Sequence, residues 1–388
     1  MKKIVLAILF IKSIIVLNAQ ENRVITTGVP FLMVAADARS AGLADQGVAT
    51  SSDAFSQQYN PAKYAFATDK IGFSASYTPY LTGLVNDISL GQITFFNKLN
   101  DRSAFAGSLR YFGLGEINQT NQNGDPLGNV FPNELAADIS YSLKLSEKFS
   151  MGIAGRYIRS NLRIATENGD ANAAQTFAVD VSGYFQSDEV ALESFNGRWR
   201  AGFNFQNLGP KINYDDTRFN ANFLPANMRL GAGYDFGFDD YNKVTVMFEV
   251  GKLLVPTPQD PDLNGDGTIT ASERTQNINN YNKIGWTEGI FKSFGDAPGG
   301  FSEELKELTY SAAVEYTYQD SFAMRLGYFN ENELKGARKF FTLGAGFKYN
   351  VVKVDVSYLF SASKVRNPLE NTLRFSLTFA FGDKYENN

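Results

Sequence analysis

The sequence predicts an all-β protein, a transmembrane antiparallel β-barrel of about 14 strands with an N-terminal hatch inside the lumen. Three observations predict it. The chain opens with an export signal, and from Lys70 onward segments of about ten residues alternate apolar with polar or small residues. Aromatic residues are also abundant, with 33 phenylalanines and 19 tyrosines. A barrel uses such residues on its lipid-facing wall and at both membrane interfaces.

The first 19 residues have the parts of a signal peptide. Lys2 and Lys3 form the basic start, an apolar run covers residues 4–17, and Ala19 is a small residue suited to cleavage. We therefore expect a signal peptide over residues 1–19. The alternative is a membrane anchor, but a spanning helix needs about 20 apolar residues and this run is shorter. No cysteine lies at the junction, so a lipoprotein is not expected.

Residues 20–69 do not alternate as a lipid-facing strand would. This segment is rich in Ala and Gly, which permit close packing, and Asn60-Pro61 marks a turn. We expect it to fold back into the lumen as a hatch.

The barrel is expected over residues 70–388. In its last segment, Leu373, Phe375 and Leu377 share one face, while Arg374 and Ser376 share the other. Alternation also suits a soluble sandwich, which would turn its largest residues inward. The expected strands start near Lys70, Val85, Ser103, Glu134, Lys148, Thr176, Arg198, Ala226, Lys243, Thr309, Ser321, Lys339, Val351 and Thr372.

The connections differ in length in a regular way. Those after even-numbered strands are mostly short, whereas those after odd-numbered strands are mostly long, as at 113–133, 207–225 and 254–308. Short periplasmic turns and long outer loops are typical of outer-membrane barrels. We therefore expect an integral protein of the cell outer membrane, with a long extracellular loop at 254–308 and both termini in the periplasm.

The inward positions of the expected strands carry charges of both signs. Charges inside a barrel are tolerated when they are paired or hydrated. Two interpretations are open: ion pairs packed around a plug, or a pathway for ions and solutes. We favour the plug because the N-terminal segment supplies material for one. The inward charged residues are Arg110, Arg156, Arg198, Arg200, Arg229, Arg325, Arg374, Asp138, Asp180, Glu249, Glu315 and Asp355.

Composition restricts the chemistry. The chain has no histidine and no cysteine, so it has neither a thiol nucleophile nor a Ser-His-Asp triad. The net charge of -5 predicts no basic face for nucleic acid. We expect no enzyme, no catalytic residues and no organic cofactor.

The long loop 254–308 contains a calcium-binding motif. Residues 262–273 match the twelve-residue EF-hand loop at its defining positions, with Gly267 at the sharp turn. The prolines at 256, 258 and 261 exclude an entering helix, whereas an exiting helix from Ala271 is possible. We expect a structural Ca²⁺ site. The alternative is an acidic turn that binds nothing. The expected ligands are Asp262, Asn264, Asp266, Thr268, Thr270 and Glu273.

Two short helices are expected further along this loop, at 282–294 and 302–308. Several of their residues are apolar although they lie outside the expected membrane region. They either pack over the barrel mouth or contact a partner. These residues are Ile284, Trp286, Ile290, Phe291 and Phe294.

Four short motifs resemble the PorV family of the Bacteroidetes type IX secretion system, a branch of the FadL-like barrels of fourteen strands. They occupy residues 37–42 (DARSAG), 47–54 (GVATSSDA), 59–62 (YNPA) and 205–212 (FQNLGPKI). The N-terminal motifs are shared with PorQ-like proteins, so they identify the superfamily better than the member. The segment at 207–211 and the total length point towards PorV.

The resemblance implies a role in protein export. It implies binding to a SprA/Sov-like translocon barrel and to the C-terminal signal domain of cargo proteins, which are then carried to a PorU-like attachment complex at the cell surface. The alternative is a FadL-type channel for hydrophobic small molecules. An outer-membrane enzyme is a weaker third possibility, because no histidine is present to act as a base.

Overall fold

The computed structural model describes residues 23–35, 37–121, 123–163, 172–214, 221–363 and 367–384, with the backbone alone at 383 and 384. The expected signal peptide, its cleavage site and the first three residues of the expected hatch lie outside the described residues.

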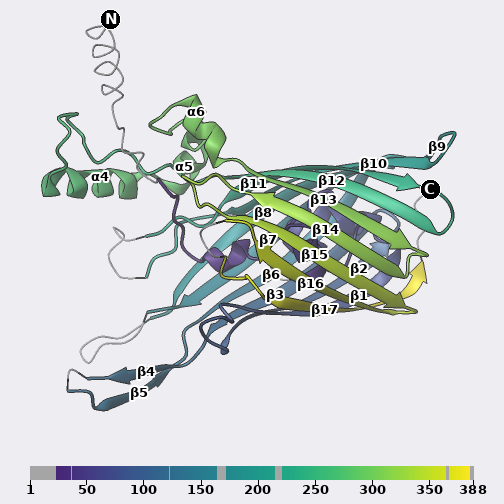
Figure 1. Ribbon diagram of the computed structural model, residues 1–388, viewed down its shortest axis with the longest axis horizontal. Helices are drawn as coiled ribbons and strands as arrows, with labels where there is room; N and C mark the ends of the chain where they lie inside the picture. The colour runs from purple at the N-terminus through teal and green to yellow at the C-terminus, as the bar shows by residue number, and fades with distance from the viewer. Residues whose placement is uncertain are drawn as a thin grey trace, which may run out of the picture.

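Within the described residues, fourteen strands form a closed antiparallel barrel (Figure 1). The wall closes where β1 pairs with β17 and where β10 pairs with β11. Each strand starts within three residues of its expected position. The wall strands are β1 (Asp69–Pro79), β2 (Ile88–Asn100), β3 (Ser103–Leu114), β6 (Asn133–Ser146), β7 (Phe149–Asn161), β8 (Ala174–Gln186), β10 (Asn196–Leu208), β11 (Asn227–Gly237), β12 (Asn242–Leu253), β13 (Thr309–Tyr318), β14 (Phe322–Asn330), β15 (Lys339–Tyr349), β16 (Val352–Ser361) and β17 (Leu373–Lys384).

Three shorter strands were not predicted. A hairpin of β4 (Ile117–Thr120) and β5 (Pro126–Val130) projects beyond the barrel, and β9 (Val190–Ala191) adds a short pairing to β10. These strands are exposed along most of their length. They have no buried face, and a strand without one gives no alternating pattern to detect.

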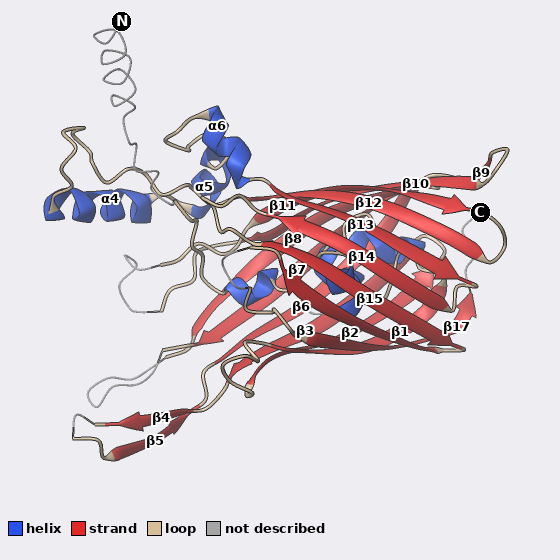
Figure 2. Ribbon diagram, viewed as in Figure 1, coloured by secondary structure: helices blue, strands red, loops and turns tan. Residues whose placement is uncertain are grey.

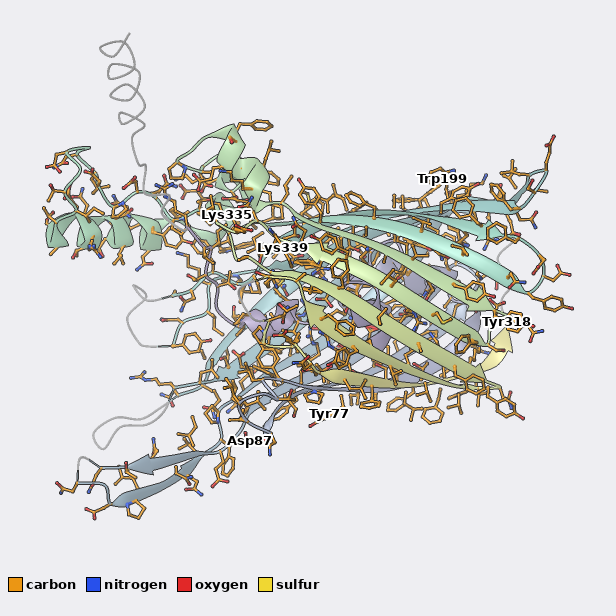
Figure 3. The ribbon with its side chains drawn as sticks, viewed as in Figure 1. Tyr77, Asp87, Trp199, Tyr318, Lys335 and Lys339 are labelled. Atoms are coloured by element: carbon orange, nitrogen blue, oxygen red, sulfur yellow. The ribbon has the colours of Figure 1, made fainter. Side chains whose placement is uncertain are left out.

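The wall is apolar outside and polar inside. On β17, Leu373 and Phe375 are each 45% exposed, while Arg374 and Ser376 between and beside them are buried. Figure 3 shows the same outward placement for Tyr77 of β1 and Trp199 of β10. A soluble sandwich would bury its largest side chains, so this arrangement excludes the sandwich and matches a lipid-facing wall.

No helix within the described segments is long and apolar enough to span a membrane.

Four short helices lie inside the barrel: η1 (Pro30–Met33), α2 (Ala38–Gly42), α3 (Ser56–Tyr59) and η2 (Pro61–Phe66) (Figure 2). Two of them begin at side-chain caps. The Asp37 carboxylate accepts a hydrogen bond from Ser40 N at 3.0 Å, and the Asn60 side chain accepts one from Ala62 N at 3.1 Å. Capping oxygens satisfy backbone N–H groups that no helical turn can satisfy. The polar residues of these motifs therefore start the turns that fill the lumen.

The two ends of the barrel differ as the connection lengths predict. We call them the long-loop end and the short-turn end. β1 begins and β17 ends at the short-turn end. Arg23, however, lies at the long-loop end, where it pairs with Asp260 at 3.2 Å and with Glu303 at 3.3 Å. The first strand thus begins, and the last strand ends, at the short-turn end, whereas the first described residue lies at the long-loop end. Strand count cannot reveal that the preceding chain runs the length of the lumen.

The long loop carries α4 (Ala271–Lys283), α5 (Trp286–Lys292), α6 (Phe301–Glu304) and the 3-10 turn η4 (Leu305–Glu307). The single helix expected at 282–294 is wrong. Gly285 has an extended backbone and caps α5, so it separates two helices. The helix expected at 302–308 corresponds to α6 and η4. We call residues 254–308 the cap.

Candidate functional site

A chain of buried ion pairs joins the hatch to the wall. Arg39 of α2 donates to Asp53 at 2.6 Å and to Glu315 of β13 at 2.9 Å. Glu315 also accepts from Arg325 of β14 at 2.6 Å, and Arg325 reaches Asp355 of β16 at 2.8 Å. Removing one member of such a chain leaves a buried charge unpaired, which costs several kcal/mol. The ion pairs therefore fix the hatch to β13 and, through Arg325 of β14, connect it to β16.

A second contact fixes the hatch backbone to β12, the strand next to β13. The Glu249 carboxylate accepts hydrogen bonds from Gly47 N and Val48 N, both at 3.0 Å, and pairs with Arg229 at 3.0 Å. Carboxylates that accept backbone N–H bonds form strong, charge-assisted contacts. Arg374 of β17 adds a longer pair to Asp45 at 3.4 Å.

A third cluster lies within the wall. Arg156 of β7 pairs with Asp138 at 2.7 Å and with Asp180 at 2.9 Å, and it also contacts Asn207. Asp180 in turn accepts from Asn207 N at 2.8 Å. Asn207 has a φ of 57° and ends the regular part of β10, so this cluster holds the point where the chain turns away from the wall.

Most of the charged residues expected to face inward do so. Arg198 differs, because it lies at the rim of the short-turn end, where its side chain is 26% exposed and pairs with Glu189. Arg229 is also partly exposed. The buried members are Arg110, Arg156, Arg200, Arg325, Arg374, Asp138, Asp180, Glu249, Glu315 and Asp355.

Glycines of the wall let the hatch backbone approach closely. A Cβ atom at position 202 would lie 2.3 Å from the carbonyl oxygen of Val48, and one at position 327 would lie 2.5 Å from the backbone nitrogen of Ala44. Both distances are far below van der Waals contact. The small inward residues of the strands therefore leave room for the hatch backbone to pack against the wall.

An apolar cluster fills the lumen towards the long-loop end. Ile212 is fully buried and forms a backbone bridge with Asn222, so the segment after β10 folds inward over the hatch. It packs in one cluster with Val29 and Phe31 of the N-terminal segment and with residues of the wall. The motif at 205–212 thus supplies part of the packing above the hatch. Sequence reasoning assigned it only by resemblance.

Buried ion pairs hold the cap. Lys252, at the end of β12, pairs with Glu307 at 2.6 Å and Glu304 at 3.1 Å. Lys335, from the turn after β14, pairs with Glu303 at 2.7 Å and Glu307 at 2.9 Å. Figure 3 shows Lys335 where the cap meets the wall. These lysines were not predicted, because their partners lie in a loop without periodicity.

Electrostatics favours the ionised form of this cluster. Burial alone would raise the pKa of Glu307, but hydrogen bonds from Lys252, Thr257 and Lys335 outweigh it and lower that pKa. The pKa of Glu303 is lowered for the same kind of reason, with Lys335 as the main donor. Burial has the opposite, dominant effect on Asp296, whose pKa is raised.

The expected calcium ligands occupy the loop before α4 and the first turn of that helix. Asp262 accepts from Gly265 N and Gly267 N, both at 2.8 Å, and Thr270 caps α4. Glu273 accepts from Thr270 N at 2.9 Å. Among the residues that the structure describes, no three Asp, Glu, His or Cys side chains converge as a metal site would.

The apolar residues of the cap divide into two sets. Ile284, Trp286 and Ile290 are half-buried, whereas Phe291 is 78% exposed and Phe294 is 50% exposed. Phe301 and Leu305 of the following turns are exposed as well. Packing over the mouth therefore accounts for only part of the apolar surface.

A closed barrel with an apolar outer wall and a filled lumen defines an integral protein of the outer membrane. The chain belongs to the PorV family, since the model described as "Type IX secretion system protein PorV" matches residues 17–260. It is therefore an outer-membrane component of a type IX secretion system.

Solved structures with a similar barrel include hydrocarbon transporters. The toluene transporter TbuX of Ralstonia pickettii is 12% identical, with a TM-score of 0.48 and coverage of 91% of this chain and 100% of that chain. The toluene transporter TodX of Pseudomonas putida is 10% identical, with a TM-score of 0.47 and coverage of 92% and 97%. A Pseudomonas aeruginosa FadL homologue is 13% identical, with a TM-score of 0.42 and coverage of 90% and 99%. No curated protein sequence matches the chain.

Proposed function

We propose that this protein is a non-enzymatic adaptor of the type IX secretion system. It binds the SprA/Sov-like translocon barrel and the C-terminal signal domain of cargo proteins, and it carries cargo to a PorU-like attachment complex at the cell surface. The observation that carries the proposal, beside the family, is the filled lumen. A barrel whose interior is occupied by its own chain offers its outer surfaces to other molecules.

The energetics of the hatch argue against the alternative, a channel for hydrophobic small molecules. Solute passage would require the hatch to move out of its position in the lumen. That movement would break the contacts of Arg39 with Glu315 and Asp53 and those of Glu249 with the hatch backbone. Breaking one buried ion pair costs about 3–5 kcal/mol. Several such losses together make spontaneous opening rare.

The cap supports a role in protein binding. Phe291, Phe294 and Phe301 are exposed at the long-loop end. Phe291 lies on α5 and Phe294 just after it, while Phe301 lies on α6, which a buried ion pair between Glu304 and Lys252 holds in place. Exposed apolar patches outside the lipid zone are typical of protein interaction sites. Rigid support lowers the entropy cost of forming an interface.

The test of partners is affinity purification of the full-length protein from detergent extracts of cells. We expect a very large barrel and proteins with a C-terminal signal domain to co-purify. A triple variant, Phe291→Ser, Phe294→Ser and Phe301→Ser, should recover less of them, and Ile278→Ser on α4 serves as the exposed control. A stoichiometric bound lipid with no protein partner would overturn the adaptor proposal, as would normal secretion after gene deletion.

An engineered disulfide that fixes the hatch to the wall distinguishes the adaptor hypothesis from the channel hypothesis. A Cβ atom on residue 231 would lie 3.3 Å from the Cβ of Ala49, near the spacing of about 3.5–4.5 Å found in disulfides. Ala49→Cys combined with Gly231→Cys would bind the hatch to β11, and the chain has no other cysteine. We expect the oxidised variant to secrete cargo as well as the single Ala49→Cys control. Secretion that stops on oxidation and returns on reduction would contradict this expectation.

A further inference from the structure

We propose that residues 262–273 bind one calcium ion and that this ion fixes the outer end of α4 to the cap. The inference is independent of the proposed role in secretion. It rests on the ligand set, on one unpaired carboxylate oxygen and on the way α4 is held.

The loop has the order of donors that calcium requires. Carboxylates stand at positions one, five and twelve, which are Asp262, Asp266 and Glu273, and an amide stands at position three. Gly267 at position six has a φ of 79°, a conformation that favours glycine. Oxygen donors in a flexible loop suit Ca²⁺ better than Mg²⁺, which demands a rigid octahedron.

Glu273 supplies the independent observation. The residue is only 9% exposed, and it is the one buried residue of α4. One carboxylate oxygen, Oε2, accepts from Thr270 N and Thr270 Oγ1, at 2.9 and 2.7 Å. The other, Oε1, is buried and has no hydrogen-bond partner. Buried polar atoms are normally paired, and a cation in the loop would pair this one.

The carboxylate of Glu273 also faces the loop. Both hydrogen bonds of its Oε2 come from Thr270, which stands at position nine of the loop. Position twelve therefore lies against position nine. Asp262 and Asp266 are turned to backbone N–H groups of the loop, so ion binding requires these two side chains to rotate.

The surroundings of α4 show what the ion would do. Its C-terminal end is tied down, because Tyr281 donates to the Pro256 carbonyl at 3.1 Å and packs on Phe223, while Lys211 donates to the Asn282 carbonyl at 3.1 Å. Its middle keeps one contact, from Asn277 to the Gln259 carbonyl at 3.0 Å, and the first part of the helix projects from the cap (Figure 1).

The sequence of α4 does little to stabilise this projecting part. The helix has 13 residues, a length at which isolated helices are marginal in water. Four of its residues are asparagine, a weak helix former. An ion bound to the residues that cap its first turn would hold the end that tertiary packing leaves free.

The experiment uses the full-length protein in detergent micelles with Ca²⁺ alone as the probe. Calorimetry should give about one site, with a Kd of about 10⁻³ M or tighter. Trypsin should cleave after Arg274, in the first turn of α4, and saturating Ca²⁺ should slow that cleavage at least about tenfold, because local opening exposes the bond. Mg²⁺ at the same concentration should not protect.

The decisive variant is Glu273→Gln. Glutamine keeps the capping box, so α4 should form as before, but the bidentate anionic ligand is lost. We expect the affinity to fall at least about tenfold and the Ca²⁺ protection of Arg274 to disappear. Glu288→Gln removes the same charge from α5 and should behave as the wild type. The proposal is overturned if the wild type binds no Ca²⁺ saturably, if Glu273→Gln binds as tightly as the wild type, or if Mg²⁺ protects equally.

Discussion

Arg39 is the side chain that ties the hatch most directly to the wall. We predict that Arg39→Met destabilises the protein by about 3–5 kcal/mol, because Asp53 and Glu315 lose a buried counter-charge. Urea unfolding in detergent micelles would measure the loss. The control is Arg198→Met at the rim, where a partly exposed pair contributes about 0–1 kcal/mol. Equal losses for the two variants would show that the hatch does not depend on this contact.

Gly327 lies directly against the hatch, and its lack of a side chain matters more there than its backbone freedom. An added methyl group would lie 2.5 Å from the nitrogen of Ala44, so Gly327→Ala should push the hatch away and cost about 1–3 kcal/mol. The matched control is Gly155→Ala, where a Cβ atom meets nothing within 4 Å. Unfolding midpoints of the two variants give the comparison, and indistinguishable midpoints would argue that the hatch can shift without loss.

At the residue scale, alternation made the inward charges predictable. A strand residue has a defined face, so Glu315 and Arg325 could be placed in the lumen before any partner was known. The position of their partner Arg39 could not be predicted, because the hatch has no repeating pattern and its contacts depend on how the segment runs through the lumen. The same reason hid the pairing of Glu249 with the backbone at Gly47.

At the scale of elements, the cap should loosen in acid. Glu303 and Glu307 have lowered pKa values in the folded protein, so their contribution is present above the unfolded pKa of about 4.3 and is lost as pH falls through the folded pKa. Asp296 opposes this trend, since its raised pKa favours the protonated form.

We therefore predict that the cap stays closed from neutral pH to about pH 5 and opens below about pH 4, with the barrel intact. Pepsin digestion or hydrogen exchange at low pH would show cleavage or exchange confined to residues 254–308. Lys335→Met should shift the opening to higher pH, because Glu303 and Glu307 lose a common donor. A cap equally protected at pH 3.5 and pH 7 would contradict the prediction.

Elements with a buried face were predictable and the others were not. All fourteen wall strands follow from alternation, because each has one apolar and one polar side. In the cap, α4 begins at Ala271, where the sequence allowed an exiting helix, whereas Gly285 breaks the apolar run that suggested one helix at 282–294. The hairpin of β4 and β5 has no buried face at all.

At the scale of the whole molecule, the hatch runs from one end of the barrel to the other. Arg23 pairs with the cap, Val29 lies in the apolar cluster below it, and η2 leads into β1 at the short-turn end. The sequence predicted a plug, but it did not predict the direction in which the segment runs through the barrel. A segment without periodicity gives no sign of which end of the barrel it starts from. The consequence is topological: the first described residue, Arg23, lies beside the long loops.

Labelling of intact cells tests this topology, because any introduced cysteine is unique in the chain. Val24 is 42% exposed at the long-loop end, and Tyr349 is 76% exposed where β15 ends, at the short-turn end. If the long loops face the cell exterior, Val24→Cys should react with a membrane-impermeant maleimide on intact cells, as should Ile278→Cys of α4. Tyr349→Cys should react only after the outer membrane is permeabilised. Reaction of Ile278→Cys without Val24→Cys would place the N-terminal segment elsewhere, and reaction of Tyr349→Cys alone would invert the barrel.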